Sequence, residues 1–248
     1  MSAQSDNEAP KQPTKTNHGS PVLKFEHVTR RRSGCLSFED VSFQLNRGEL
    51  LVIHLEEGCE DIGLADIALG LEQTDSGHVR YRNTEWFWPS SEADERRRAE
   101  IGRVFRSGGW IANLNVLENI TLAQRYHAGR TLDELMPAIT TWGKLAGLDD
   151  IPTDRPAAVS SAETLRCAQW VRAYYTEPPM VIMEQPMEDV PDRKLQPLVD
   201  IVAKAQTGGT AVLWLTSDPR VLWHRTVLSS SRFRMSGSRM IPDEEIRL

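Results

Sequence analysis

Carboxylates crowd one short loop of this sequence, at Glu56, Glu57, Glu60 and Asp61. Such a cluster can bind a cation, repel an anion, or simply be solvated ahead of a helix whose N-terminus favours negative charge. Its spacing matches no calcium loop, so we expect no metal there. Each like-charge contact at about 4 Å costs on the order of 4 kcal/mol at an effective dielectric near 20. The loop is therefore either solvated surface or a place that excludes polyanions.

Polar residues also stand where other expected elements begin or end. Glu184 and Gln185 follow one short apolar run, Ser217 follows another, and Ser161 precedes a helical pattern. A carboxylate such as Glu184 can bind a cation, whereas the amide of Gln185 cannot accept a proton as a general base. A serine such as Ser161 is typical of a helix N-cap.

The composition excludes several classes of protein. The chain has 248 residues, 40% of them hydrophobic and 26% charged, with a net charge of -6, which is typical of one globular domain. Its three cysteines form no C-x-x-C pair, so neither a disulfide framework nor a zinc site is predicted. Mild acidity disfavours nucleic-acid binding, and the arginines of 96–98 are explained by i,i+4 pairs on a solvated helix.

Two features indicate where the protein works. The longest wholly apolar stretch, Ala211 to Leu215, is five residues, and a membrane-spanning helix needs about 18 or more. Residues 1–20 contain no apolar core of a secretory signal, and we expect them to form a disordered tail. These features predict a cytoplasmic protein.

The polar segments must be positioned by an α/β framework. Alternating patterns predict half-buried strands at 22–28 and 38–45, and an exposed strand is predicted at 78–82. Continuous apolar runs predict buried strands at 49–55, 180–183 and 210–216. Helical patterns cover 62–71, 195–206 and several segments between about 113 and 175. Strands separated by helices predict a mostly parallel sheet that is covered on both faces and interrupted by a helical insert.

Segments in this order and spacing resemble the nucleotide-binding subunit of an ATP-binding cassette (ABC) transporter, over about residues 22–227. They are Gly48-Glu49-Leu50-Leu51-Val52-Ile53, Ser76-Gly77-His78-Val79, Ile101 to Arg106 with Asn113 to Ile120, Arg172 to Met183, and Gly209 to Leu213. The resemblance implies a P-loop NTPase-like ABC ATPase fold whose mostly parallel sheet has an antiparallel β edge. It also implies a domain at 21–230, a helical subdomain at about 107–175 and a C-terminal extension at 231–248. Residues 114–119 resemble the lipid-transport branch of the family.

The phosphate-binding loop departs from the family pattern G-x-x-G-x-G-K-[ST]. Of that pattern only Gly58 is retained. Asp61 stands where the lysine would reach the phosphates, and Ile62 and Gly63 stand where a hydroxyl would bind magnesium. The resemblance thus assigns Gly58, Asp61, Ile62 and Gly63 to degenerate positions of a nucleotide site. Asp61 and the neighbouring acids place negative charge where a polyanion would lie.

The remaining nucleotide-site positions depart as well. Arg106 replaces a glutamine that contacts magnesium and water, and Glu184 stands at the magnesium-side aspartate. Gln185 replaces the general-base glutamate, and Ser217 the switch histidine. Ser161 matches the serine of the signature segment, with Glu163 two residues further on. The resemblance thus implies no catalytic residue, no metal site and no cofactor, unless the degenerate site still binds ATP and magnesium.

The leading hypothesis is a degenerate ABC-type subunit, a pseudo-ATPase with a structural or regulatory role in a membrane transport complex, possibly one for lipids. The alternatives are a soluble scaffold that has left transport and a divergent ATPase that uses other residues. The resemblance implies a membrane permease as partner, with an active paralogue or a second copy. It also implies a place at the inner face of the membrane through that permease.

Two substitutions also suggest how the fold stays ordered without nucleotide. Asp61 reverses the charge of the family's lysine, and Arg106 adds a positive charge in place of its glutamine. In the family these two positions converge on one site. We expect Arg106 to turn into that site and pair with Asp61, with another acid of the loop, or with Glu184.

Overall fold

The structure is a computed structural model that describes residues 20–32, 35–56, 62–154, 156–222, 227 and 229–243. Within those ranges, ten strands form one sheet with the order β5-β4-β1-β2-β10-β9-β3-β8-β7-β6. The strands are β1 (Leu23–Arg32), β2 (Cys35–Leu45), β3 (Leu50–Leu55), β4 (Ser76–Tyr81), β5 (Thr84–Glu85), β6 (Ile101–Val104), β7 (Met180–Glu184), β8 (Ala211–Thr216), β9 (Ser231–Ser236) and β10 (Arg239–Pro242).

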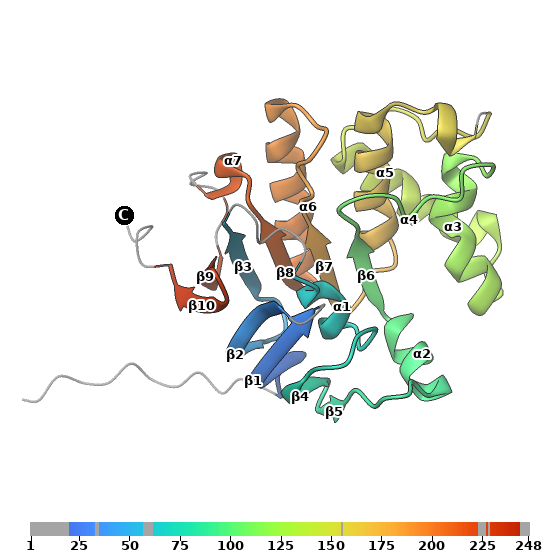
Figure 1. Ribbon diagram of the computed structural model, residues 1–248. Helices are drawn as coiled ribbons and strands as arrows, with labels where there is room; N and C mark the ends of the chain where they lie inside the picture. Colours follow the sequence, from blue (N-terminus) through green and yellow to red (C-terminus); the bar gives the residue numbers. More distant parts are fainter. Residues whose placement is uncertain are drawn as a thin grey trace, which may run out of the picture.

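Helices fill most of the chain between the strands. They are α1 (Leu64–Ala68), α2 (Glu92–Arg98), α3 (Val116–His127), α4 (Leu132–Leu145), α5 (Ala162–Tyr174), α6 (Leu195–Thr207) and α7 (Pro219–Leu222), with short 3-10 turns at Ala157–Val159 and Asp192–Lys194. Figure 1 shows α3 to α6 gathered together, away from the antiparallel strands β1, β2, β4 and β5. In the described part of the chain, no helix is long and apolar enough to cross a bilayer.

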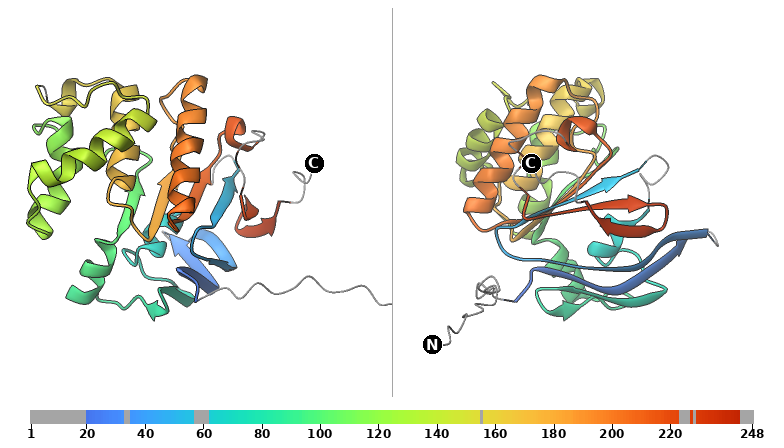
Figure 2. Two further views of the ribbon diagram at one scale, coloured as in Figure 1. Left: turned by 180° about the vertical axis from the view of Figure 1, so that it is seen from behind. Right: turned by 90° about the vertical axis from the view of Figure 1, so that its left-hand side faces the viewer.

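The central strands run parallel, and their two faces pack on different partners. β3, β6, β7, β8 and β9 are paired in parallel. One face, including Val181 and Trp214, packs against the helices of the insert and α6. The other face, including Ile182 and Leu213, packs against α1 and the antiparallel strands, a layer seen edge-on in Figure 2. The expectation of two covered faces is confirmed, although antiparallel strands supply much of the second cover.

Most of the predicted elements are present, and the main differences have local causes. The buried strands near 180–183 and 210–216 and the helix near 195–206 are confirmed as β7, β8 and α6. The helix predicted over 62–71 is much shorter, because Gly63 and Gly70 adopt φ of 75° and 64° at its two ends. Residues 231–242, assigned from the sequence to an extension, form β9 and β10 and lie inside the sheet between β2 and β3.

This arrangement brings the polar segments of the sequence to one edge. Parallel strands share a direction, so the carboxyl ends of β3, β6, β7 and β8 lie along the same side of the sheet. Glu56, Arg106, Glu184 and Ser217 each lie at or within two residues of such an end. We refer to this side as the carboxyl edge.

The position of β6 at this edge depends on a close approach to α5. A Cβ atom at Gly102 would collide with the backbone carbonyl oxygen of Ala173, which no side-chain rearrangement can relieve. We expect Gly102→Ala to lower the free energy of unfolding by about 2 kcal/mol or more, as overpacking does.

The matched control is Gly143→Ala inside α4, where a Cβ would lie 3.6 Å from the nearest side-chain atom. It should leave stability unchanged or raise it by up to about 1 kcal/mol, because alanine favours helix. Urea unfolding of both variants checks the pair, and equal effects would contradict the close approach.

Candidate functional site

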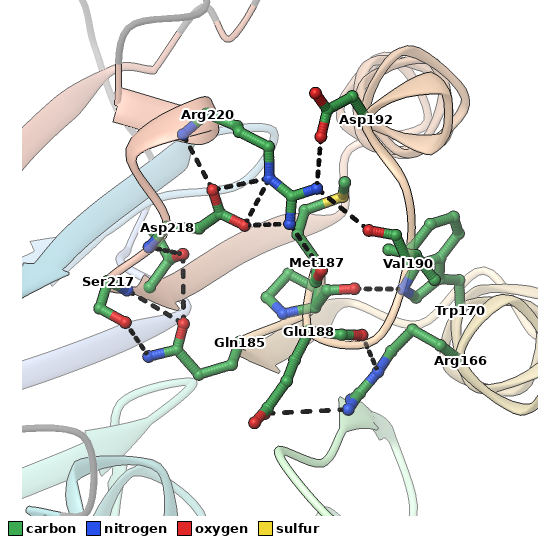
Figure 3. Close-up of polar contacts among 12 residues, drawn as sticks. Arg166, Trp170, Gln185, Met187, Glu188, Val190, Asp192, Ser217, Asp218 and Arg220 are labelled. Atoms are coloured by element: carbon green, nitrogen blue, oxygen red, sulfur yellow. Dashed lines mark hydrogen bonds and ion pairs between the residues drawn. The ribbon is translucent and has the colours of Figure 1, made fainter. Parts of the chain in front are cut away.

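Gln185 and Ser217, which the sequence analysis assigns to the general-base and switch positions, bind each other at the carboxyl edge (Figure 3). The Gln185 side-chain amide donates to Ser217 Oγ at 3.0 Å, and its carbonyl oxygen accepts from the Ser217 backbone N–H at 3.0 Å. Gln185 is only 7% exposed, and its backbone has a φ of 45°. Both ends of the amide are therefore engaged, and neither can take a proton from water.

Glu184, which the sequence analysis assigns to the magnesium-side position, is bound by an arginine that the sequence analysis missed. Arg103 of β6 donates through Nε to Glu184 Oε2 at 2.9 Å, and its terminal Nη2 lies 2.7 Å from the same oxygen. Its other terminal nitrogen donates to Asp66 Oδ1 of α1 at 2.6 Å. The guanidinium thus links three elements at the place where the family resemblance puts the metal.

Arg106 does not take the predicted role toward Glu184. Its Nε lies 3.9 Å from Glu188 Oε2, and both side chains are more than 40% exposed. Of the partners expected for Arg106, Glu184 is bound by Arg103 instead. Pairing of Arg106 with an acid of residues 57–61 stays a prediction. The chain leaves β6 at Val104, after which the alternation of the strand no longer dictates where a side chain points. Residues 57–61, which include Gly58 and Asp61, lie outside the described residues.

Two more arginines hold the loop that follows β7 (Figure 3). Arg166 of α5, 5% exposed, donates to the backbone carbonyls of Phe105 at 2.6 Å, Arg106 at 2.7 Å and Glu188 at 3.0 Å. Burial lowers the pKa of Arg166, and the nearby carboxylates of Glu188 and Asp189 oppose that shift. The Arg166 side chain therefore joins the segments that follow β6 and β7 by donating to backbone carbonyls of both.

Arg220 of α7 holds the same loop from the other side. It binds Asp218 at 2.6 Å and Asp192 at 2.8 Å, and donates to the carbonyls of Met187 at 2.9 Å and Val190 at 3.0 Å. The hydrogen bond to Asp218 raises the pKa of Arg220, so its charge is permanent. Residues 187–192 are thereby fixed by the chain's own side chains.

The signature segment is built as an ordinary helix start. Ser161 is the N-cap of α5, and its hydroxyl accepts from the Thr164 backbone N–H at 3.1 Å. Glu163 in the first turn binds Arg193 at 2.7 Å and lies 3.7 Å from Lys194. The N-cap interpretation of Ser161 is confirmed, and the adjacent carboxylate is paired within the chain.

Comparisons with known proteins agree with this architecture. No family model matches the sequence. The chain is 26% identical over 203 residues to the uncharacterized ABC transporter ATP-binding protein YphE of Escherichia coli, covering 79% of this chain and 39% of YphE. It is 27% identical over 206 residues to the ribose import ATP-binding protein RbsA 1 of Rhizobium meliloti, covering 79% of this chain and 39% of that protein. The chain thus spans about two fifths of the length of these two relatives.

A shorter relative and the solved structures extend the agreement. The lipoprotein-releasing system ATP-binding protein LolD of Idiomarina loihiensis is 24% identical over 182 residues, covering 73% of this chain and 79% of LolD. The dimeric structure of MJ0796, a bacterial ABC transporter cassette, superposes with a TM-score of 0.79 at 18% identity, covering 91% of this chain and 99% of that one. The chain has the fold of an ABC-transporter ATP-binding domain. The predicted fold class is confirmed.

Within this ABC-type fold, the described residues do not fit Mg-ATP in the family's manner. The Glu184 carboxylate is taken by Arg103, and Ile62, at a hydroxyl position, is apolar and 7% exposed. The cavity between α1 and the end of β7 holds about 20 Å³, room for about one water molecule. Among the residues that the structure describes, no three His, Cys, Asp or Glu side chains are grouped to hold a metal ion.

The helix after the phosphate-loop position is also a poor anion site. α1 has five residues, its N-cap Gly63 offers no side-chain cap, and Asp66 puts negative charge in its first turn. A macrodipole builds up from aligned peptide units, so a helix this short attracts an anion weakly, and Asp66 opposes the attraction further.

Arg166 should be the most important of the polar clamps for stability. We expect Arg166→Met to lower the free energy of unfolding by about 2 to 5 kcal/mol, because three backbone carbonyls lose their donor. Arg193→Met, which removes a 67% exposed arginine bound to Glu163, should cost less than about 1 kcal/mol. Urea unfolding measures both free energies of unfolding. If Arg166→Met lowers that free energy no more than Arg193→Met does, the three carbonyls have found other partners.

Proposed function

We propose that this chain is a catalytically degenerate ABC-type subunit, a pseudo-ATPase that has a structural or regulatory role in a membrane transport complex. The observation that carries the proposal is the closed pair of Gln185 and Ser217. Where the ABC fold needs a base and a polar partner to act on water, this chain has an amide and a hydroxyl that satisfy each other. General-base assistance contributes about 10² to 10⁴-fold to a rate, and that contribution is lost here.

Charge supports the loss of nucleotide binding. The sequence places Glu56, Glu57, Glu60 and Asp61 around the phosphate-loop position. A single close like-charge contact costs on the order of 4 kcal/mol, which is about the whole free energy of millimolar binding. Glu56 lies 3.7 Å from Arg234, with about a third of each side chain exposed, so this ion pair offsets only part of that charge.

For the partner we propose a membrane permease, bound at the helical insert. Apolar side chains there are exposed to solvent, among them Ile111 at 44%, Leu122 at 40%, Tyr126 at 80% and Val159 at 67%. In this proposal these side chains belong to one binding surface, since a contiguous apolar patch marks a protein-binding site whereas single exposed apolar residues are ordinary. Trp110, by contrast, packs partly against the core and lies under the guanidinium of Arg172.

The proposed place and cargo follow from the same resemblance. Binding to a permease would hold the chain at the cytoplasmic face of the membrane, beside an active ABC ATPase paralogue or a second copy. MJ0796, a structural relative, is described as dimeric. Two observations support a lipid-transport complex. The segment from Leu114 to Asn119 resembles the lipid-transport branch of the family, and one sequence relative, LolD, is named as the ATP-binding protein of a lipoprotein-releasing system.

Purified protein should not bind Mg-ATP in the family's manner, because Glu184 is engaged by Arg103 and the neighbouring loop is acidic. Isothermal titration calorimetry with Mg-ATP measures this, with an active ABC cassette as positive control. A dissociation constant below about 100 µM, or roughly 5.5 kcal/mol of binding free energy, would refute the proposed loss of binding.

Phosphate release should be absent even at saturating Mg-ATP, because Gln185 leaves water without a base. The measurement compares the wild-type chain with Glu184→Gln, which removes the one carboxylate that could still hold magnesium at the end of β7. A robust rate in the wild type that disappears in Glu184→Gln would establish a divergent ATPase in place of a pseudo-ATPase.

A further inference from the structure

Arg103 occupies an unusual place for an arginine, inside a parallel strand. Alternation along β6 puts Ile101 and Arg103 on the face that packs against α1, and Gly102 and Val104 on the helix face. β6 is in register with β7, where Ile182 faces the same way as Glu184. The strand pattern therefore aims Arg103 and Glu184 at the same space next to α1.

The contacts in that space are those of a bridging cation. The Arg103 side chain is 13% exposed, and its nitrogens lie 2.6 Å from Asp66 and 2.7 Å from Glu184. Its guanidinium also lies 4.6 Å from the centre of the Phe105 ring, within the range of a cation–π interaction. The two carboxylates come from separate elements, α1 and β7, and would repel each other without a positive charge between them.

We propose that Arg103 is the resident cation of this fold, a side chain that stands where the ABC fold would place a divalent metal and that holds the carboxyl edge closed without any ligand. Charge explains the exchange, because a guanidinium brings fixed positive charge to Glu184 and Asp66 without the six-oxygen shell that magnesium demands. Geometry explains the choice of arginine, because its planar fork donates to two carboxylates at once, which an ammonium does less well.

The position of the bridge gives it a structural task. It ties β6, β7 and α1 together at the point where a bound nucleotide and metal would tie them in an active cassette. This inference rests on the proposed function and deepens it, because it explains how a cassette that binds no nucleotide keeps that edge ordered. The test below uses no nucleotide, so its outcome is independent of Mg-ATP binding. The bridge can be refuted while the proposed loss of Mg-ATP binding stands, and Mg-ATP binding can be found while the bridge stands.

Thermal unfolding of the full chain tests the bridge. Arg103→Gln should lower the melting temperature by at least about 4 °C, because Glu184 and Asp66 lose the positive charge that both contact. Adding Glu184→Gln to that variant removes the repulsion, so the double variant should melt above Arg103→Gln alone. If Arg103→Gln does not fold, folding of the double variant is the supporting result.

Arg106→Gln is the matched control, the same substitution three residues along, in a 41% exposed side chain whose ion-pair partner among the described residues is Glu188 at 3.9 Å. It should lower the melting temperature by less than half as much. A control effect as large as that of Arg103→Gln, or a double variant that melts no higher than the single one or fails to fold, would overturn the proposal.

Millimolar MnCl2 supplies an independent readout on the wild-type chain. If Arg103 fills the cation position, MnCl2 should not change the melting temperature relative to NaCl of equal ionic strength. A manganese-specific rise that disappears in Glu184→Gln would show that the position takes a metal and that Arg103 is displaced.

Discussion

The carboxyl edge imposes the constraint on which the rest of this structure depends. Parallel strands that end together leave backbone carbonyls and polar side chains close to one another in partly buried surroundings, and each must find a partner. In a nucleotide-binding cassette, ligand and metal supply part of that pairing. Here Arg103, Arg166 and Arg220 supply it, and each does so by joining two or more elements. The charge of each arginine is satisfied by more than one acceptor, which makes its partial burial tolerable.

α5 organises this edge more than any other helix. Besides Arg166, its Gln169 accepts from the Phe105 backbone N–H at 2.9 Å and donates to the Gly108 carbonyl at 3.2 Å, and Trp170 donates to the Pro186 carbonyl at 3.1 Å. Three neighbouring residues thus fix the loops after both β6 and β7. Those partners are part of the chain, and the same contacts would resist a rearrangement of the loops on ligand binding.

The sequence predicted the framework better than the site. Continuous apolar runs predicted β3, β7 and β8, because a strand that is buried on both faces needs apolar residues at nearly every position. Ser161 was predictable as a cap from its type and position alone. The bridging role of Arg103 was not predicted, because the family pattern points to Arg106 as the arginine of this site. The alternation of side chains along β6 places Arg103 on the same face of the sheet as Glu184. The pairing of β9 with β3 was not predictable, since long-range pairing leaves no local signal in residues 231–236.

Gln185 and Ser217 are chemically matched to each other at this edge. A glutamate at position 185 would bury a carboxylate, which would need a positive partner, and Ser217 could not provide one. The Gln185 amide donates to the Ser217 hydroxyl oxygen, and its carbonyl oxygen accepts from the Ser217 backbone N–H and, at 3.4 Å, from Thr216 Oγ1. The two positions at which the family resemblance predicts a reactive pair therefore hold side chains that hydrogen-bond each other.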